Sequence, residues 1–173
     1  MLRRIFLMGF LVLSLTACQA PDIDQTALSG ASGETTVFLV RHAEKQKGAN
    51  PSLTAAGLRR AEALAAQLID EELTAIYSTD YARTRETADA VSKATGVAVS
   101  LYDPSDLPDF AKTVKVMSGR ILVVGHSNTT PELVSLLGGD AGTPIDDVVE
   151  FNRLYTVEIS PIETTTAQTT YGD

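Results

Sequence analysis

The stretch that decides the fold is VFLVRHAEK, Val37–Lys45. Its first four residues are all apolar, which is typical of a strand buried in a core. Arg41, His42 and Glu44 follow almost without a break, so polar side chains begin where the strand should leave the core. This stretch therefore predicts a strand that presents chemically active groups at its carboxyl end.

A second stretch, ILVVGHSNTTPELV, Ile121–Val134, has the same arrangement, with His126 directly after an apolar run and a glycine. His42 and His126 are the two histidines of the chain. Ligands of open parallel sheets bind at the carboxyl ends of the strands. A single histidine at such a position is more often structural than functional, but both histidines of the chain follow predicted strands, which favours a functional site at that edge.

Short apolar runs alternate with amphipathic segments from Val37 onward, which predicts an α/β fold. Gly96 and Gly138 are expected to end helices, and the threonine-rich tail either adds an edge strand or frays. Strands are predicted over residues 37–40, 75–77, 97–101, 120–124 and 154–159, and helices over 54–70, 80–95, 110–117 and 129–137. The first of these helices should bury one stripe of residues: Leu58, Ala61, Leu64, Ala65 and Leu68.

Composition excludes some classes of function. The chain has 173 residues with a formal net charge of −8, which argues against a partner with a phosphate backbone, so no nucleic-acid partner is expected. Cys18 is the single cysteine, so neither an intramolecular disulfide nor a multi-cysteine metal site can form. The length fits one globular domain, predicted to span residues 36–173.

The N-terminal residues have the layout of an export signal: two arginines, an apolar run and small residues before Cys18. LTAC, residues 15–18, resembles the lipobox of bacterial lipoproteins, which implies removal of residues 1–17 and acylation of Cys18; the alternative is a plain secretory signal. Residues 18–35 are predicted to be a flexible tether between lipid and domain. Gln19 favours the outer membrane, facing the periplasm, if the host is Gram-negative.

A third polar segment, YSTDYARTRETADA, Tyr77–Ala90, places two arginines in the first turns of the helix predicted over residues 80–95. Guanidinium groups and the free N–H groups of a helix N-terminus both donate hydrogen bonds to an anion. Arg83 and Arg85 are therefore candidates for phosphate binding, although Arg85 is also expected to lie on the surface and pair with Glu86 or Asp89.

Taken together, the three segments VFLVRHAEK, YSTDYARTRETADA and ILVVGHSNTTPELV resemble the signature segments of the histidine phosphatase superfamily, also called phosphoglycerate mutase-like. The resemblance covers about residues 36–155 in the family's order. It implies a three-layer α/β/α sandwich with a mostly parallel central sheet. The family's middle pattern aligns with Ser78, Arg83, Thr84 and Thr87, which selects Arg83 over Arg85 as the phosphate ligand.

The resemblance also implies the site residues. His42 would be the nucleophile that becomes phosphorylated, Arg41, Arg83 and His126 would hold the phosphoryl oxygens, and no cofactor or metal would be needed. Covalent catalysis by a neutral imidazole and charge neutralisation by the surrounding cations agree with these roles. Lys45 and Gly48 stand where sugar-phosphate mutases usually offer a serine and an asparagine, which argues for hydrolysis rather than mutase activity.

The proton donor to the leaving group is the least determined residue. Many family members place it after the third strand, where LYDPSDLPDF, residues 101–110, offers Asp103, Asp106 and Asp109. Asp106 is the preferred candidate and Glu44 the reserve. The competing interpretation of Asp106 or Asp109 is a helix cap.

The sequence thus predicts an exported, lipid-anchored phosphatase that hydrolyses phosphomonoesters through a phosphohistidine. Its expected partners are phosphorylated small molecules or envelope saccharides, and the membrane through the N-terminal lipid. One alternative is a domain that binds a phosphorylated envelope ligand without turnover. Another is a metal site of His42, Glu44 and His126 with nearby carboxylates, which lacks a compact metal-binding spacing.

Overall fold

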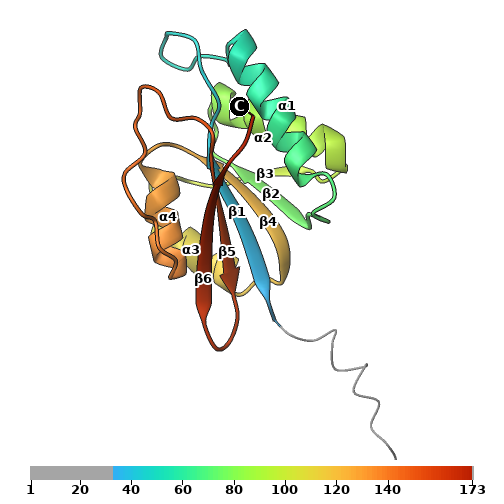
Figure 1. Ribbon diagram of the computed structural model, residues 1–173, viewed down its shortest axis with the longest axis vertical. Coiled ribbons are helices and arrows are strands. Elements are labelled where there is room, and N and C mark those ends of the chain that lie inside the picture. Colours follow the sequence, from blue (N-terminus) through green and yellow to red (C-terminus); the bar gives the residue numbers. More distant parts are fainter. Residues whose placement is uncertain (1–32, 173) are drawn as a thin grey trace, which may run out of the picture. The chain divides into compact units, whose positions relative to one another are not determined.

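Strand β1, Thr35–Arg41, carries the first signature segment into a six-stranded sheet with the strand order β3-β2-β4-β1-β5-β6. The structure, a computed structural model, describes residues 33–172 (Figure 1). The other elements are α1 Ala55–Leu68, β2 Ala75–Ser78, α2 Ala82–Thr95, β3 Val99–Leu101, α3 Leu107–Lys115, β4 Gly119–Gly125, α4 Thr129–Leu137, β5 Arg153–Ile159 and β6 Thr164–Thr170. The predicted signal peptide and Cys18 lie outside the described residues.

The register of the two central strands brings the two histidines together. β3, β2, β4 and β1 are parallel, whereas β5 and β6 are antiparallel to their neighbours. Arg41 at the end of β1 lies opposite Gly125 at the end of β4. The next residue of each strand is a histidine, so His42 and His126 leave the sheet side by side at its carboxyl edge.

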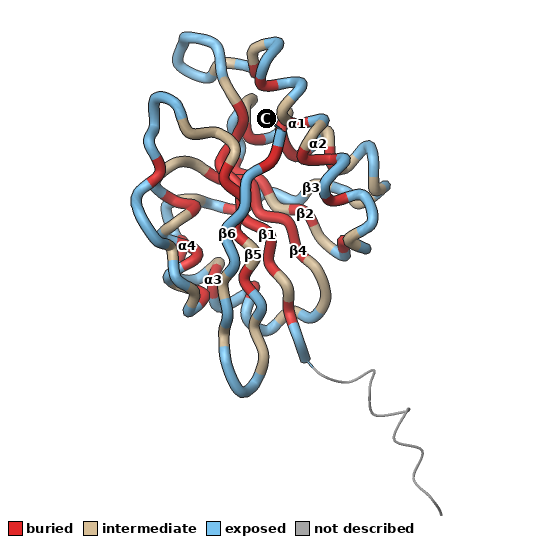
Figure 2. The backbone as a smooth tube through the Cα atoms, in the orientation of Figure 1, coloured by how far each residue is buried: buried red, intermediate tan, exposed pale blue. Residues whose placement is uncertain are grey.

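The helices form the two outer layers. α1 and α2 cover one face of the sheet, and α3 and α4 cover the other (Figure 1). Alternate residues of β1 divide between the two cores: Val37 and Leu39 pack with α3 and α4, and Phe38 and Val40 with α1 and α2. The central strands β1 and β4 are accordingly buried on both faces, while edge strand β6 is largely exposed (Figure 2). The predicted three-layer α/β/α sandwich is confirmed.

All five predicted strands and all four predicted helices are present, with differences at their ends. α1 buries four of the five residues of the predicted stripe, but Leu58 is half exposed and Gly57 takes its place in the core. A Cβ atom on Gly57 would collide with the backbone carbonyl of Glu44, so only glycine lets α1 approach this loop. The threonine-rich tail forms β6 as an edge strand.

Two helix starts differ from the prediction. α2 begins at Ala82 with Tyr81 as its N-cap rather than Asp80, whose carboxylate instead pairs with Arg85 at 2.8 Å. α3 begins at Leu107, three residues before the predicted start, because the side chain of Asp106 caps it. None of the helices described for residues 33–172 has the length and hydrophobicity needed to cross a membrane.

Candidate active site

A cavity of about 480 Å³ lies at the carboxyl edge of the sheet, between the ends of β1 and β4 and the first turns of α2 and α4. It brings together residues from all three signature segments. Its charged lining residues are two cations, Lys45 and Arg83, and one carboxylate, Asp147. The full lining is His42, Lys45, Tyr81, Arg83, Pro104, Ser105, His126, Ser127, Asn128, Thr129 and Asp147.

His42 has the protonation state that a nucleophile needs. Its Nδ1 lies 2.8 Å from the carbonyl oxygen of Ala43, which can only accept a hydrogen bond, so Nδ1 carries the proton and Nε2 the lone pair. His42 is 3% exposed, and burial, reinforced by the charges of Arg41 and Arg83, lowers its pKa to about 3. His42 is therefore a neutral imidazole near pH 7, with Nε2 available to attack phosphorus.

His126 faces His42 at a ring-centroid distance of 5.5 Å, with an angle of 71° between the ring planes. Its Nε2 lies 3.0 Å from the Thr79 hydroxyl oxygen, and its Nδ1 lies 3.4 Å from Nη2 of Arg83. Burial, followed by the charges of Arg83 and Arg41, lowers the pKa of His126 to about 4. His126 is therefore neutral near pH 7 in the free protein, and it becomes a cationic clamp only if a bound anion raises its pKa.

Arg83 lies in the cavity and Arg85 does not. The guanidinium of Arg83 stacks 4.6 Å from the centre of the Tyr81 ring, and its Nε has no hydrogen-bond partner among the described residues. Thr87 accepts a hydrogen bond from Ala43 N–H at 3.1 Å and donates one to the Arg83 carbonyl at 2.8 Å, which ties α2 to the nucleophile loop. The preference for Arg83 over Arg85 agrees with this placement.

Arg41 is 2% exposed and adjoins His42, but most of its donors are already engaged. Its Nη1 donates to the carbonyls of Asp146 and Glu150 at 3.2 and 2.9 Å, and its Nη2 to the carbonyl and carboxylate of Asp147 at 2.9 and 2.8 Å. Phe151 stacks on the guanidinium at 4.0 Å. In the free protein Arg41 therefore anchors the loop of residues 146–151 beside the cavity, and Nε is its donor without a partner among the described residues.

Asp147 is a site residue that the sequence did not reveal. Its Oδ1 accepts hydrogen bonds from Ser127 at 2.6 Å and from Arg41 at 2.8 Å, and its side chain is 73% exposed at the cavity. The bond from Ser127, followed by the charge of Arg41, lowers the pKa of Asp147. The sequence shows only an acidic loop here, because the contact depends on how that loop folds back onto β1.

Asp106 is not brought to His42. Its carboxylate is exposed and accepts a hydrogen bond from the Asp109 N–H at 3.3 Å as the N-cap of α3. Together with Asp103 and Asp109 it lines a separate pocket against Tyr102 and other residues. The preferred proton donor thus occupies the position that the capping interpretation predicts, and from the same segment Pro104 and Ser105 reach the cavity.

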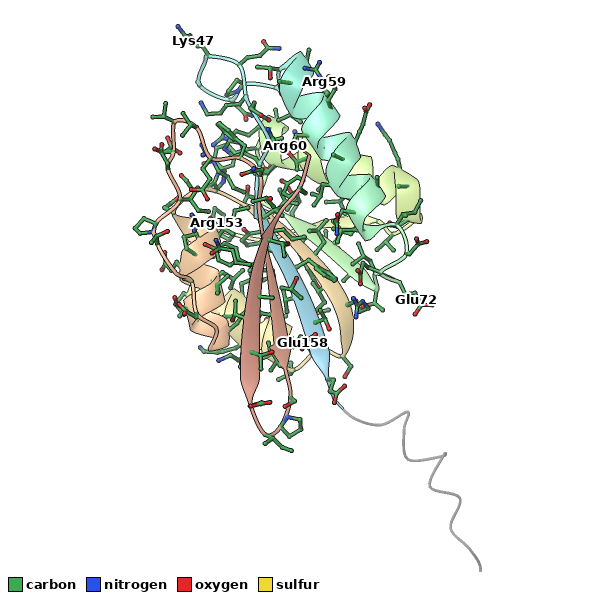
Figure 3. All side chains as sticks on the ribbon, in the orientation of Figure 1. Lys47, Arg59, Arg60, Glu72, Arg153 and Glu158 are labelled. Carbon is green, nitrogen blue, oxygen red and sulfur yellow. The ribbon has the colours of Figure 1, made fainter. Side chains whose placement is uncertain are left out.

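Glu44, the reserve candidate, also has another partner. Both of its carboxylate oxygens accept hydrogen bonds from Nε of Arg60, at 2.9 and 3.0 Å. Arg60, which is labelled in Figure 3, also donates to the carbonyls of Tyr171 and Gly172. This ion pair lowers the pKa of Glu44, against the effect of burial. Among residues 33–172 no three metal-ligating side chains gather in one place, so the alternative metal site gains no support there.

Comparisons with known proteins agree with this fold. Residues 37–104 match the family model of the histidine phosphatase superfamily (branch 1). The structure is similar to the protein histidine phosphatase SixA complexed with tungstate, with a TM-score of 0.66 at 17% identity over 78% of this chain and 96% of that chain. No curated protein sequence gives a significant match.

Two further solved structures are similar. The putative phosphohistidine phosphatase SixA from Agrobacterium tumefaciens gives a TM-score of 0.58 at 19% identity, over 82% of this chain and 98% of that one. Phosphoglycerate mutase from Bacillus anthracis gives 0.59 at 16% identity, over 82% and 94%. The predicted phosphoglycerate mutase-like fold is confirmed, and the resemblance to the histidine phosphatase superfamily is confirmed over residues 37–104.

Proposed function

We propose that the protein is a phosphatase that hydrolyses phosphate esters through a phosphohistidine formed on His42. The observation that carries this proposal is the state of His42, a neutral ring with its Nε2 lone pair at a cavity that also exposes Arg83 and Lys45. A phosphoryl group bound in this cavity would lie close to both the nucleophile and these two cations. Neutralising the oxygens of the phosphoryl group is the main task of such a site.

The reaction would proceed in two displacements. Nε2 of His42 attacks phosphorus while the bond to the leaving oxygen breaks, and water then attacks the phosphohistidine and returns the lone pair to Nε2. The Nδ1–H bond to the Ala43 carbonyl holds the ring in orientation through both steps and stabilises the positive charge that the ring acquires. Arg83 can donate to the phosphoryl oxygens from its Nε, which has no partner among residues 33–172, and from the other nitrogens of its guanidinium group.

The substrate class follows from the groups that could protonate the leaving group. Among the described lining residues, Asp147 supplies the one carboxyl group, and its lowered pKa keeps it ionised near pH 7. A site of this kind favours leaving groups that need little protonation, such as phenols, or the ring nitrogen of a phosphoramidate. One SixA neighbour is named a protein histidine phosphatase and the other a putative phosphohistidine phosphatase, which supports a phosphoramidate as the second candidate substrate.

The direct test is turnover of p-nitrophenyl phosphate and of a phosphoramidate by the wild type and by two matched variants. Arg83→Ala should lower kcat/KM by about 100-fold or more, since it removes a charged donor to the phosphoryl group. Arg85→Ala, two residues away on the same helix but paired on the surface with Asp80, should stay within about twofold of the wild type. Equal effects of the two substitutions would contradict the proposed site.

A non-catalytic phosphate-binding domain is the alternative. It predicts that inorganic phosphate binds to the wild type, that Arg83→Ala abolishes this binding, and that no ester or phosphoramidate is hydrolysed. Turnover that survives a chelator and is blocked by vanadate supports the phosphatase without a metal. Loss with chelator and rescue by zinc would support a metal enzyme instead.

We further propose that the protein is exported and anchored to the cell envelope by lipid on Cys18, where phosphorylated envelope saccharides are accessible substrates. The support is the sequence alone, through the arginines, the apolar run and LTAC before the tether. Metabolic labelling with a fatty acid should mark the wild type and leave Cys18→Ser unlabelled and released from membranes. Labelling of Cys18→Ser would refute this assignment.

A further inference from the structure

A row of buried hydroxyl groups runs from His126 into the start of α2. Thr79 and Thr84 are both 0% exposed. Nε2 of His126 lies 3.0 Å from the Thr79 hydroxyl oxygen, which lies 3.0 Å from the Thr84 hydroxyl oxygen. Because a hydroxyl group donates only one hydrogen bond, the direction of this row decides where His126 carries its proton.

The inner end of the row sets that direction. The Thr84 hydroxyl faces two backbone carbonyls, those of Thr79 at 2.9 Å and Tyr81 at 3.0 Å. A carbonyl only accepts, so the Thr84 hydroxyl donates its hydrogen bond to one of these carbonyls and accepts one from the Thr79 hydroxyl. Thr79 in turn has no proton left for His126 and can only accept, which requires a proton on Nε2 of His126.

The outer end of the row requires the same state. Nδ1 of His126 lies 3.4 Å from Nη2 of Arg83, and a guanidinium nitrogen donates but does not accept. Nδ1 must therefore carry the lone pair in the free protein. His42 has the opposite arrangement, with its proton on Nδ1 and its lone pair on Nε2.

We propose that Thr79, backed by Thr84, is a positioning residue that holds the proton of neutral His126 on Nε2, so that Nδ1 takes up one proton when a phosphoryl group enters the cavity. This inference rests on the proposed function of the site. The charged and titratable groups around His126 are Arg41 and His42 from the end of β1, Arg83 and Tyr81 from the start of α2, and Asp147 from the loop before β5, and Lys45 lines the same cavity. In the free protein the arginines oppose a charge on His126, and the phosphoryl group reverses that balance.

Proton transfer through Nδ1 of His126 also explains how the leaving oxygen can be protonated without a carboxylic acid in the site. A substrate monoanion gives its proton to Nδ1, and the departing oxygen takes this proton as its bond to phosphorus breaks and the bond from His42 Nε2 forms. In the second step water bonds to phosphorus, one water proton goes to Nδ1, and the electron pair of the P–N bond returns to Nε2. His126 then releases the proton to the phosphate product, which restores the starting state.

The test of the positioning role is the tautomer of His126, measured by long-range ¹H–¹⁵N NMR. The chain has two histidines, so His42→Gln assigns every imidazole signal. The wild type should show protonated Nε2 in His126 and protonated Nδ1 in His42. Because Arg83 also favours this tautomer by donating to Nδ1, the test of Thr79 is made in an Arg83→Ala background. There Thr79→Val should convert His126 to a mixture of tautomers, and Thr79→Ser should retain the wild-type pattern. A protonated Nδ1 in wild-type His126, or an unchanged pattern when Thr79→Val is combined with Arg83→Ala, would overturn the proposal.

Phosphate binding gives a second measurement that needs no turnover. Calorimetry with inorganic phosphate in two buffers of different ionisation enthalpy should show uptake of about one proton by the wild type near pH 7.5, where phosphate is mainly dianionic. Thr79→Val should weaken binding about tenfold, the equivalent of one hydrogen bond to a charged donor, and Thr79→Ser should restore it. Thr165→Val, the same change on exposed strand β6, should match the wild type.

The proposed phosphatase activity and the proposed role of Thr79 can be refuted separately. Phosphate binding without hydrolysis of any substrate would refute the phosphatase, while leaving the tautomer and the proton uptake as predicted. Hydrolysis with no proton uptake would refute the positioning role of Thr79 and leave the phosphatase in place.

Discussion

Acidification should destabilise the protein through its buried histidines well above the pH at which they become charged in the folded state. The pKa of His42 is lowered from 6.5 to about 3 on folding. Between these two values the unfolded chain binds a proton that the folded protein does not, so the free energy of unfolding falls as the pH falls. At pH 5 the gap to 6.5 is about 1.5 units, and at 1.36 kcal/mol per unit the loss from His42 is about 2 kcal/mol. His126 adds a smaller loss because it is partly exposed.

Urea unfolding followed by circular dichroism at pH 7, 6 and 5 measures this effect. His42→Gln is the matched variant, because an amide can still donate to the Ala43 carbonyl but does not titrate. The carboxylates contribute equally in both proteins, so the loss of stability between pH 7 and 5 should be about 2 kcal/mol smaller in His42→Gln. An equal loss in both proteins would refute the claim that His42 is held neutral by its surroundings.

Three other substitutions test the account of the fold and the site. Asp106→Ala should lower the free energy of unfolding by about 1 kcal/mol in urea through loss of the α3 cap, with equal effects on alkyl and aryl phosphate turnover; a loss confined to alkyl phosphates would make Asp106 the proton donor. Arg41→Lys should speed amide hydrogen exchange in residues 146–151, since the three donors of one ammonium cannot satisfy the three carbonyls and the carboxylate that the planar guanidinium binds, and unchanged exchange would contradict the anchoring role. Gly125→Ala should lower the free energy of unfolding in urea by about 1–3 kcal/mol through overpacking, because its Cβ atom would lie 2.9–3.0 Å from three hydroxyl oxygens. Gly33→Ala is the control, because a Cβ atom there would have no described atom within 4 Å.

The sequence predicts the centre of the fold well because the deciding interactions there are local or follow from register. Four apolar residues before His42, and the matching run before His126, were sufficient to place both histidines at one edge of a parallel sheet. The first helix was predicted to begin at residue 54, and the Thr54 hydroxyl caps α1 by accepting from the Gly57 N–H at 3.1 Å. Each of these signals lies within a few residues of the group that it positions.

The sequence reveals least where a side chain has partners far along the chain. The loop that engages most donors of Arg41 begins 105 residues later, so no nearby signal predicts this contact, and the binding of phosphate by Arg41 stays a prediction. Asp147 enters the site through that same loop, so no nearby signal identifies it. The tautomer of His126 is equally hidden, because it depends on Thr79 and Thr84, which are brought to it only by the pairing of β2 with β4.

The central claim is that His42 carries the phosphoryl group, and rapid quench into base followed by mass spectrometry tests it most directly. During turnover of p-nitrophenyl phosphate, the wild type should hold one phosphoryl group on the peptide that contains His42. This group should be stable in base and lost in acid, and His42→Ala should neither carry it nor turn over substrate. Turnover by His42→Ala, or a phosphoryl group on another residue of the wild type, would contradict the account.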